Sequence, residues 1–78
     1  MNYADVRWNI TISNKLRTLI KKSGKTQREI AKDLHIYESV ISDMLHGRRL
    51  TICNVVDMAC YFGVSIDWLV GLRNEDHN

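Results

Sequence analysis

Hydrophobic and polar positions between Thr26 and Gly47 follow the helical period in two short blocks. Apolar residues recur at positions 30, 31 and 34 in the first block, and at positions 40, 41, 44 and 45 in the second. Thr26 and Glu29 have the spacing of a capping box, in which side chains satisfy the orphan amides at a helix start. Only residues 35–37 separate the two blocks. The segment therefore predicts two short helices joined by a sharp turn.

Three further helices are predicted, over residues of about 14–22, 52–62 and 66–70. The residues expected to cap or end them are Ser13, Gly24, Thr51, Gly63 and Ser65. Their expected core side chains are Leu16, Leu19, Ile20, Ile52, Val55, Val56, Ala59, Phe62, Val64 and Leu69. The pattern of the whole chain is that of an all-α protein.

The first twelve residues fit two structures. Val6, Trp8, Ile10 and Ile12 alternate with polar residues, which is the period of a half-buried strand that would need a second strand to pair with. Val6 and Ile10 also lie four apart, as in an early extension of the first helix. The sequence does not decide between the strand and the helix. The predicted organisation is an N-terminal extension (1–12), one domain (13–72) and a flexible polar tail (73–78).

The length and composition are those of a small globular protein. With 78 residues, 45% hydrophobic and 26% charged, it is long enough for one domain with one core. There is no apolar run long enough to span a membrane, and no signal peptide is visible. Two cysteines do not make a disulfide framework. We expect a cytoplasmic protein with no membrane partner.

No set of residues with catalytic or metal-binding spacing is found. Cys53 and Cys60 lie on one side of a predicted helix with Asp57, but two thiols do not complete a tetrahedral zinc site, so buried or half-buried thiols are expected. The chain lacks a set of nucleophile, base and orienting residue, and it lacks a glycine-rich phosphate cradle. We expect no enzyme activity, no metal and no cofactor.

The net charge of +2 permits binding to a polyanion without demanding it. Lysines and arginines concentrate before residue 33, and Arg48 and Arg49 form a pair after the second helix of the central segment. Most acids lie from Glu38 onwards. The bases fit a phosphate backbone, although a solvated face of small helices gives a similar pattern.

Several motifs in order resemble one family. Thr-Gln-x-Glu-Ile-Ala at 26–31, Ile41, Gly47 and the run FGVSIDWLVG at 62–71 resemble the Cro/repressor-type (XRE-like) helix-turn-helix family of phage and bacterial transcription regulators. The resemblance covers residues 13–71. It implies a compact five-helix bundle of the phage-repressor DNA-binding type, which binds double-stranded operator DNA, usually as a dimer, with the second helix of the motif in the major groove.

The resemblance also implies site residues. Those expected to read DNA bases are Tyr37, Glu38, Ser39, Val40 and Asp43. Those expected to bind DNA phosphates are Gln27, Arg28, Ser42, Arg48 and Arg49. Carboxylates can accept from the cytosine amino group, serine can bond several base edges, and valine can meet the thymine methyl group. A helix start such as that at Gln27 attracts phosphate through its unpaired amides.

Four positions depart from the family pattern. His35 stands where glycine is usual, in a turn that needs a positive φ; histidine tolerates that region at a cost of about 1 kcal/mol. Tyr37 stands where Ser or Thr usually caps the second helix, and it cannot cap in that way. Glu38 and Asp43 place acids on the face that would approach DNA, which opposes binding.

Ile66, Trp68 and Leu72 are candidates for a second apolar face, on which two copies or a partner would associate. Alternatively, Trp68 seals the bundle. The predicted function is a sequence-specific transcription regulator, either a phage or prophage repressor or a Cro-like protein, acting on operator DNA as a homodimer. The alternative is a protein-interaction module of the same fold, an antirepressor or modulator that binds another phage regulator instead of DNA.

Overall fold

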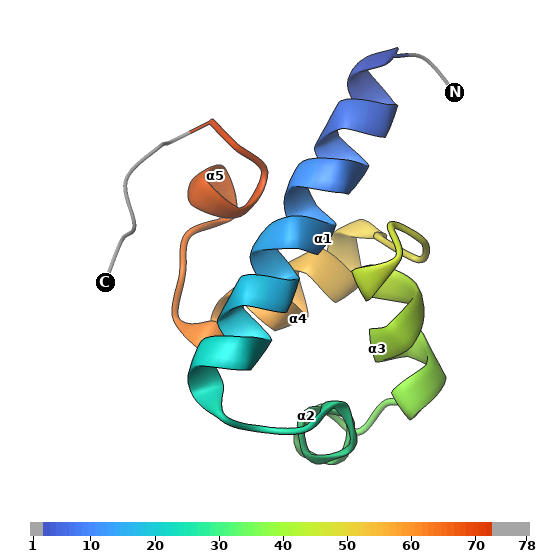
Figure 1. Cartoon of the computed structure of the whole chain (residues 1–78), viewed down its shortest axis with the longest axis vertical. Helices are drawn as coiled ribbons and strands as arrows, with labels where there is room; N and C mark the ends of the chain where they lie inside the picture. The colour runs from blue at the N-terminus through green and yellow to red at the C-terminus, as the bar shows by residue number, and fades with distance from the viewer. Residues whose placement is uncertain (1–2, 73–78) are drawn as a thin grey trace.

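The computed structural model describes residues 3–72, with side chains from residue 7 onwards. In this range the chain forms the helices α1 (Tyr3–Ser23), α2 (Gln27–Leu34), α3 (Glu38–Leu45), α4 (Ile52–Phe62) and α5 (Ile66–Leu69), and no strand (Figure 1). The predicted all-α fold with five helices is confirmed. None of the described helices is long and apolar enough to cross a membrane. The tail expected at 73–78 lies outside the described residues.

The helices pack around one core, because each has an apolar stripe that must leave water. α1 runs along the molecule with α3 on one side and α5 on the other, while α2 packs on α3 and α5 packs on α4 (Figure 1). The core side chains, to which every helix contributes, are Ile12, Leu16, Ile30, Ala31, Ile41, Met44, Leu45, Val55, Met58, Ala59 and Leu69.

The first helix begins eleven residues before the position predicted for it, at Tyr3 instead of about residue 14. The strand alternative for residues 6–12 is wrong, since α1 continues through this segment and no described strand is present to pair with it. Ser13 is therefore not an N-cap. It lies inside the helix at 7% exposure, and its hydroxyl donates to the carbonyls of Asn9 and Ile10, at 2.9 and 3.1 Å. Ile12 and Leu16, four residues apart, bury the same face of α1.

The other predicted helix ends are confirmed to within one residue. Thr51 and Ser65 cap α4 and α5 by accepting from the amides three residues further on. Gly24 and Gly63 follow α1 and α4 with positive φ. α5 ends at Leu69, one residue earlier than predicted.

Helix α4 presents a different set of side chains to the core than the sequence predicts. Met58 is fully buried, whereas Ile52 is 80% exposed, because the first turn of α4 extends past the core to the rim of a groove. The thiols of Cys53 and Cys60 are free and exposed, so the expectation of buried or half-buried thiols is wrong. They lie with Asp57 on the side of α4 opposite Val55 and Met58.

Candidate nucleic-acid interface

The start of α2 is fixed by the predicted capping box. The Thr26 hydroxyl accepts from the Glu29 amide at 3.1 Å, and the Thr26 amide donates to the Glu29 carboxylate at 2.8 Å. Gln27, the first residue of the helix, is half-buried, and Arg28 is exposed. Two candidate phosphate ligands thus lie at a helix start, where the backbone dipole favours an anion.

The turn between α2 and α3 is built as the sequence predicts. His35 is left-handed, with φ 58° and ψ 42°, and the Ile36 amide returns to the Ala31 carbonyl at 3.0 Å. Ile36 packs against the core and fixes the angle between the helices. Tyr37 precedes α3 without a side-chain capping bond, and the residue is 82% exposed. The turn therefore places a large aromatic side chain on the surface at the start of α3.

One face of α3 is in the core and the opposite face is open. Ile41, Met44 and Leu45 are buried. The residues on the other side are polar: Glu38 and Ser39 are exposed, and Ser42 and Asp43 are partly so. Val40 is half-buried and packs against the core, so less of it is available than of the other base-reading candidates. The open face of α3 is consequently a polar strip over two helical turns.

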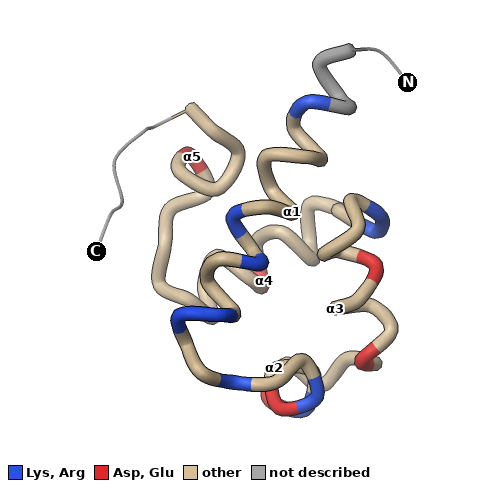
Figure 2. The backbone as a smooth tube through the Cα atoms, in the orientation of Figure 1, with Lys and Arg blue, Asp and Glu red and all other residues tan. Residues whose placement is uncertain are grey.

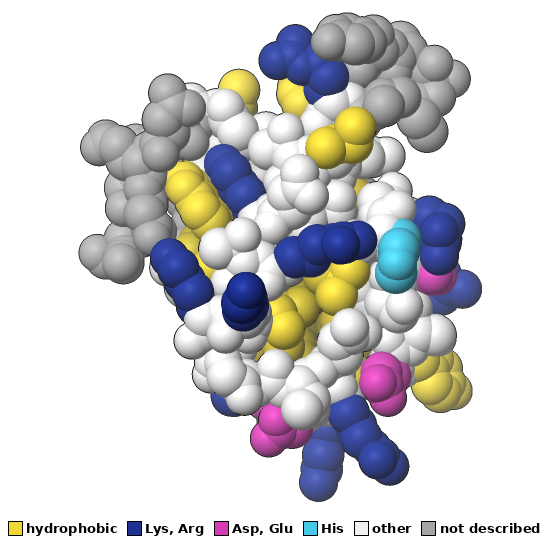
Figure 3. Space-filling model, viewed as in Figure 1, with side chains coloured by type: hydrophobic (Ala, Val, Ile, Leu, Met, Phe, Trp, Pro, Cys, Tyr) yellow, Lys and Arg dark blue, Asp and Glu magenta, His cyan; other side chains and the backbone are white. Residues whose placement is uncertain are grey.

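The loop after α3 folds back onto this strip. Gly47 has φ 78°, and the amide of Arg48 donates to the Asp43 carbonyl at 2.8 Å. The side chains of Arg48 and Arg49 both pair with the Asp43 carboxylate, at 3.1 and 2.9 Å. Figure 2 shows the acidic position near the end of α3 beside the basic loop, and in Figure 3 acidic and basic side chains meet beside a histidine at the edge of the molecule. The structure thus joins two predicted phosphate ligands to a predicted base reader.

A bond from α1 holds the end of α3. The guanidinium of Arg17 donates to the Leu45 carbonyl through Nε at 2.9 Å and through Nη2 at 2.6 Å. A cation at a helix C-terminus also meets the negative end of the backbone dipole. Sequence reasoning missed this contact, because nothing along the chain connects positions 17 and 45. It fixes the orientation of α3 relative to the bundle.

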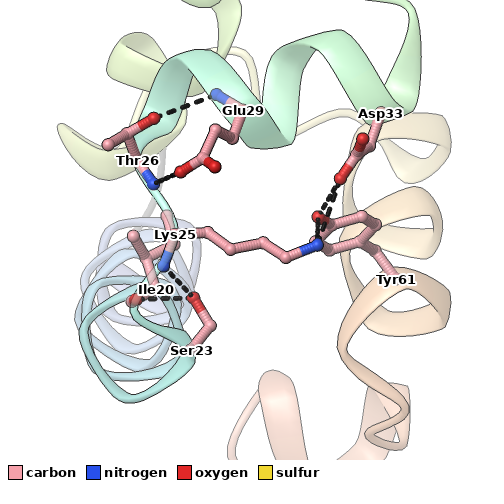
Figure 4. Close-up of polar contacts among 7 residues, drawn as sticks. All are labelled: Ile20, Ser23, Lys25, Thr26, Glu29, Asp33 and Tyr61. Atoms are coloured by element: carbon pink, nitrogen blue, oxygen red, sulfur yellow. Dashed lines mark hydrogen bonds and ion pairs between the residues drawn. The ribbon is translucent and has the colours of Figure 1, made fainter.

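Three polar side chains connect the α1–α2 loop, α2 and α4 (Figure 4). The Lys25 ammonium donates to the Tyr61 hydroxyl at 2.8 Å and to the Asp33 carboxylate at 3.2 Å, and the Tyr61 hydroxyl donates to Asp33 at 2.5 Å. The hydrogen bond from Tyr61, and then that from Lys25, lowers the pKa of Asp33 below its usual 3.8. Bonds to Tyr61 and Asp33 raise the pKa of Lys25. The cluster holds α2 against α4 and leaves the open face of α3 unobstructed.

The three predicted association residues lie in different surroundings. Ile66 lines an apolar groove of about 540 Å³ between α1, α4 and α5, whose other lining residues are Trp8, Asn9, Ile12, Leu50, Ile52, Val55, Val56 and Val70. Trp68 is half-buried, with the Lys15 ammonium 4.6 Å from its ring centroid, as in the alternative that it seals the bundle. Leu72 is 70% exposed and does not line the groove. Among the described residues no three His, Cys, Asp or Glu side chains gather as a metal site.

The family comparison agrees with this geometry. A family model described as helix-turn-helix matches residues 16–69, more than half of the chain. No curated protein and no solved structure gives a significant match. The matched family consists of DNA-binding regulatory domains, not of enzymes. The chain therefore belongs to the XRE-type helix-turn-helix family of DNA-binding transcription regulators.

Proposed function

We propose that the protein is a sequence-specific regulator of the phage or prophage repressor or Cro-like kind, which binds operator DNA with α3 in the major groove. The observation that carries this proposal is the open polar strip of α3, held outward by a fully apolar inner face. The start of α2 precedes the strip in the chain, and the loop with Arg48 and Arg49 follows it. Both segments offer hydrogen-bond donors for DNA phosphates.

Roles follow from exposure. Glu38 and Ser39, both exposed in the first turn of α3, are the strongest candidates for base contacts, with the exposed ring of Tyr37 beside them. Gln27, Arg28 and the free backbone amides of the first turn of α2 bind the phosphates of one DNA strand. The acidity of the strip is lower than the sequence implies, since Asp43 is neutralised by two arginines. That neutralisation favours DNA over a basic partner.

The test is selection of duplexes from a random double-stranded library, followed by anisotropy titrations of the selected and scrambled duplexes. We expect a preferred sequence, and affinity that falls steeply between about 50 and 200 mM salt. Ser39→Ala should change the preferred base at one position, whereas Arg28→Ala should weaken all duplexes alike. No binding to any duplex at low salt would contradict the proposal.

We also propose that the regulator acts as a homodimer, joined through the groove end of the molecule. The support is the exposure of Trp8, Ile52 and Ile66, at 52%, 80% and 42%, which line one groove. Sedimentation equilibrium should give a dimer mass, and Ile66→Asp should give a monomer with an unchanged circular dichroism spectrum. Tyr37→Asp, which places a charge at an exposed position that does not line the groove, is the matched control and should remain dimeric.

The same groove favours a second candidate, a module that binds another regulator protein. In that case the apolar groove would receive the partner, and the acids of α3 would contact its basic groups. Tests of oligomeric state, duplex binding and partner binding distinguish the two functions. A monomer that binds no duplex at low salt, yet forms a stable complex with a phage regulator, would establish the second candidate.

A further inference from the structure

Asp43 occupies an unusual position for a residue expected to read bases. Its Oδ1 accepts from Nη2 of Arg48 at 3.1 Å, and its Oδ2 pairs with Nε of Arg49 at 2.9 Å. Each carboxylate oxygen therefore already has a charged donor. A cytosine amino group approaching Asp43 would have to share or displace one of them.

The backbone is arranged to keep these pairs. The Asp43 carbonyl accepts from the amides of His46 and Arg48, at 3.0 and 2.8 Å, so the loop is closed on the same residue that receives the side chains. Arg49 is left-handed, with φ 55°, a conformation that non-glycine residues rarely adopt. Its carbonyl accepts from the Asn54 side chain at 2.8 Å, which holds that conformation from α4. The arrangement is set by four residues of two helices and a loop, not by a chance meeting of long side chains.

The burial of the three side chains is unequal. Asp43 is 23% exposed, whereas Arg48 and Arg49 are 64% and 57% exposed. The arginines therefore reach solvent, where phosphates would approach, while the carboxylate lies behind them. The three groups together carry a net charge of +1, so part of the arginine charge is cancelled before DNA arrives.

We infer that Asp43 is a positioning and specificity-determining residue. It holds Arg48 and Arg49 against α3, and it lowers the affinity of these two arginines for the phosphates of DNA whose bases do not match the reading face of α3. This inference rests on the proposed DNA-binding function. A phosphate must compete with the carboxylate for the same guanidinium donors. Because sequence-independent affinity comes from phosphate neutralisation with counterion release, the carboxylate lowers that affinity. The base-reading role implied by the family resemblance is the competing interpretation.

The test is Asp43→Asn in the full chain, with binding to a short duplex of arbitrary sequence measured by anisotropy at several salt concentrations. The amide keeps the shape of the carboxylate but cannot form the ion pairs. The quantity compared is the slope of the logarithm of the binding constant against the logarithm of the salt concentration. Freeing two arginines should increase the magnitude of this slope by up to about 1.8, at about 0.9 per neutralised phosphate. Over about 50 to 200 mM salt this corresponds to an additional loss of affinity of about tenfold for the variant, with tighter binding than the unmodified protein at low salt.

Asp57→Asn is the matched control, because it removes one negative charge from an exposed position of α4 outside the proposed DNA-binding residues, and no ion pair of Asp57 with either arginine is present among the described side chains. It should leave the slope unchanged. Arg48→Ala/Arg49→Ala provides the second control, since adding Asp43→Asn to it should no longer alter the slope. Thermal melts of all variants verify that the fold is kept.

Each outcome decides between the interpretations. A slope unchanged by Asp43→Asn, together with a changed preference at one base pair, would overturn the inference and assign Asp43 to base reading, with the proposed function intact. An equal slope change in Asp57→Asn would also overturn it, because the effect would then follow from the change in net charge alone. No binding by either the unmodified protein or Asp43→Asn at low salt would overturn the proposed function and this role with it.

Discussion

Two ends of the molecule differ in the polarity of their exposed side chains. The helix-turn-helix end consists of α2, α3 and the loop 46–51, and the groove end consists of the first half of α1, the start of α4, and α5. At the helix-turn-helix end, α3 is apolar inside and polar outside, and its Asp43 pairs with Arg48 and Arg49 of the following loop. At the groove end, large apolar side chains such as Trp8 and Ile52 face solvent. A closed core beneath a polar face suits a rigid reading surface, whereas open apolar surface marks a place for association.

The largest effect expected from this comparison is on stability. Ile41→Ala, at a fully buried position of α3, should lower the free energy of unfolding by about 2–5 kcal/mol, because it removes apolar contacts and leaves a cavity. Ile52→Ala is the matched control at the groove end, and its 80% exposure should keep the change within about 0.5 kcal/mol for the monomer. Chemical denaturation measures both. Equal losses would contradict the view that the groove end is open.

The second effect concerns the turn between α2 and α3. His35→Gly should raise the free energy of unfolding by about 1 kcal/mol, and Tm by several degrees, because glycine adopts the left-handed conformation without strain. Gly63→Ala makes the reverse change at φ 67°, where an added Cβ meets nothing within 4 Å, so only the backbone conformation is tested. It should lower Tm. A clear drop in Tm for His35→Gly would mean that the imidazole has a role beyond filling the turn.

The smallest effect is a pH dependence at the Lys25, Asp33 and Tyr61 cluster. The pKa of Asp33 is lowered in the folded state, so its contribution to stability is complete above its unfolded pKa, near 3.8, and is lost as the pH falls further through the folded pKa. Melting curves of Asp33→Asn and of the unmodified protein should therefore converge in acid. Lys32→Gln is the control: it removes a nearby exposed charge that makes only the smallest contribution to lowering the pKa of Asp33, so most of the acid dependence should remain. A constant gap in Tm from pH 6 down to about pH 2 would contradict the assignment.

Local physics explains why much of the helix-turn-helix end could be predicted from the sequence. The capping box of Thr26 and Glu29, the left-handed turn at His35 and the absence of a cap at Tyr37 each depend on residues within one turn of helix. The apolar period likewise identified Ile41, Met44 and Leu45 as the inner face of α3. The residues expected on the exposed face of α3 came instead from the family resemblance.

Contacts between distant residues were decided only by the tertiary structure. Residues 6–12 alternate as in a strand but also fit a helix, and the packing of Ile12 in the core, with no described strand beside it, decides for helix. The exposure of Ile52 depends on where α4 begins relative to the core, which its own period does not specify.

The chain alone thus determined the type and ends of most helices and the polar character of the α3 face, because capping and amphipathic burial act over a few residues. The folded structure decided which groups meet. Arg17 reaches Leu45, Lys25 reaches Tyr61, and Arg49 turns back onto Asp43 only once the helices are packed. Such pairings depend on the relative placement of whole helices, which no local sequence pattern encodes.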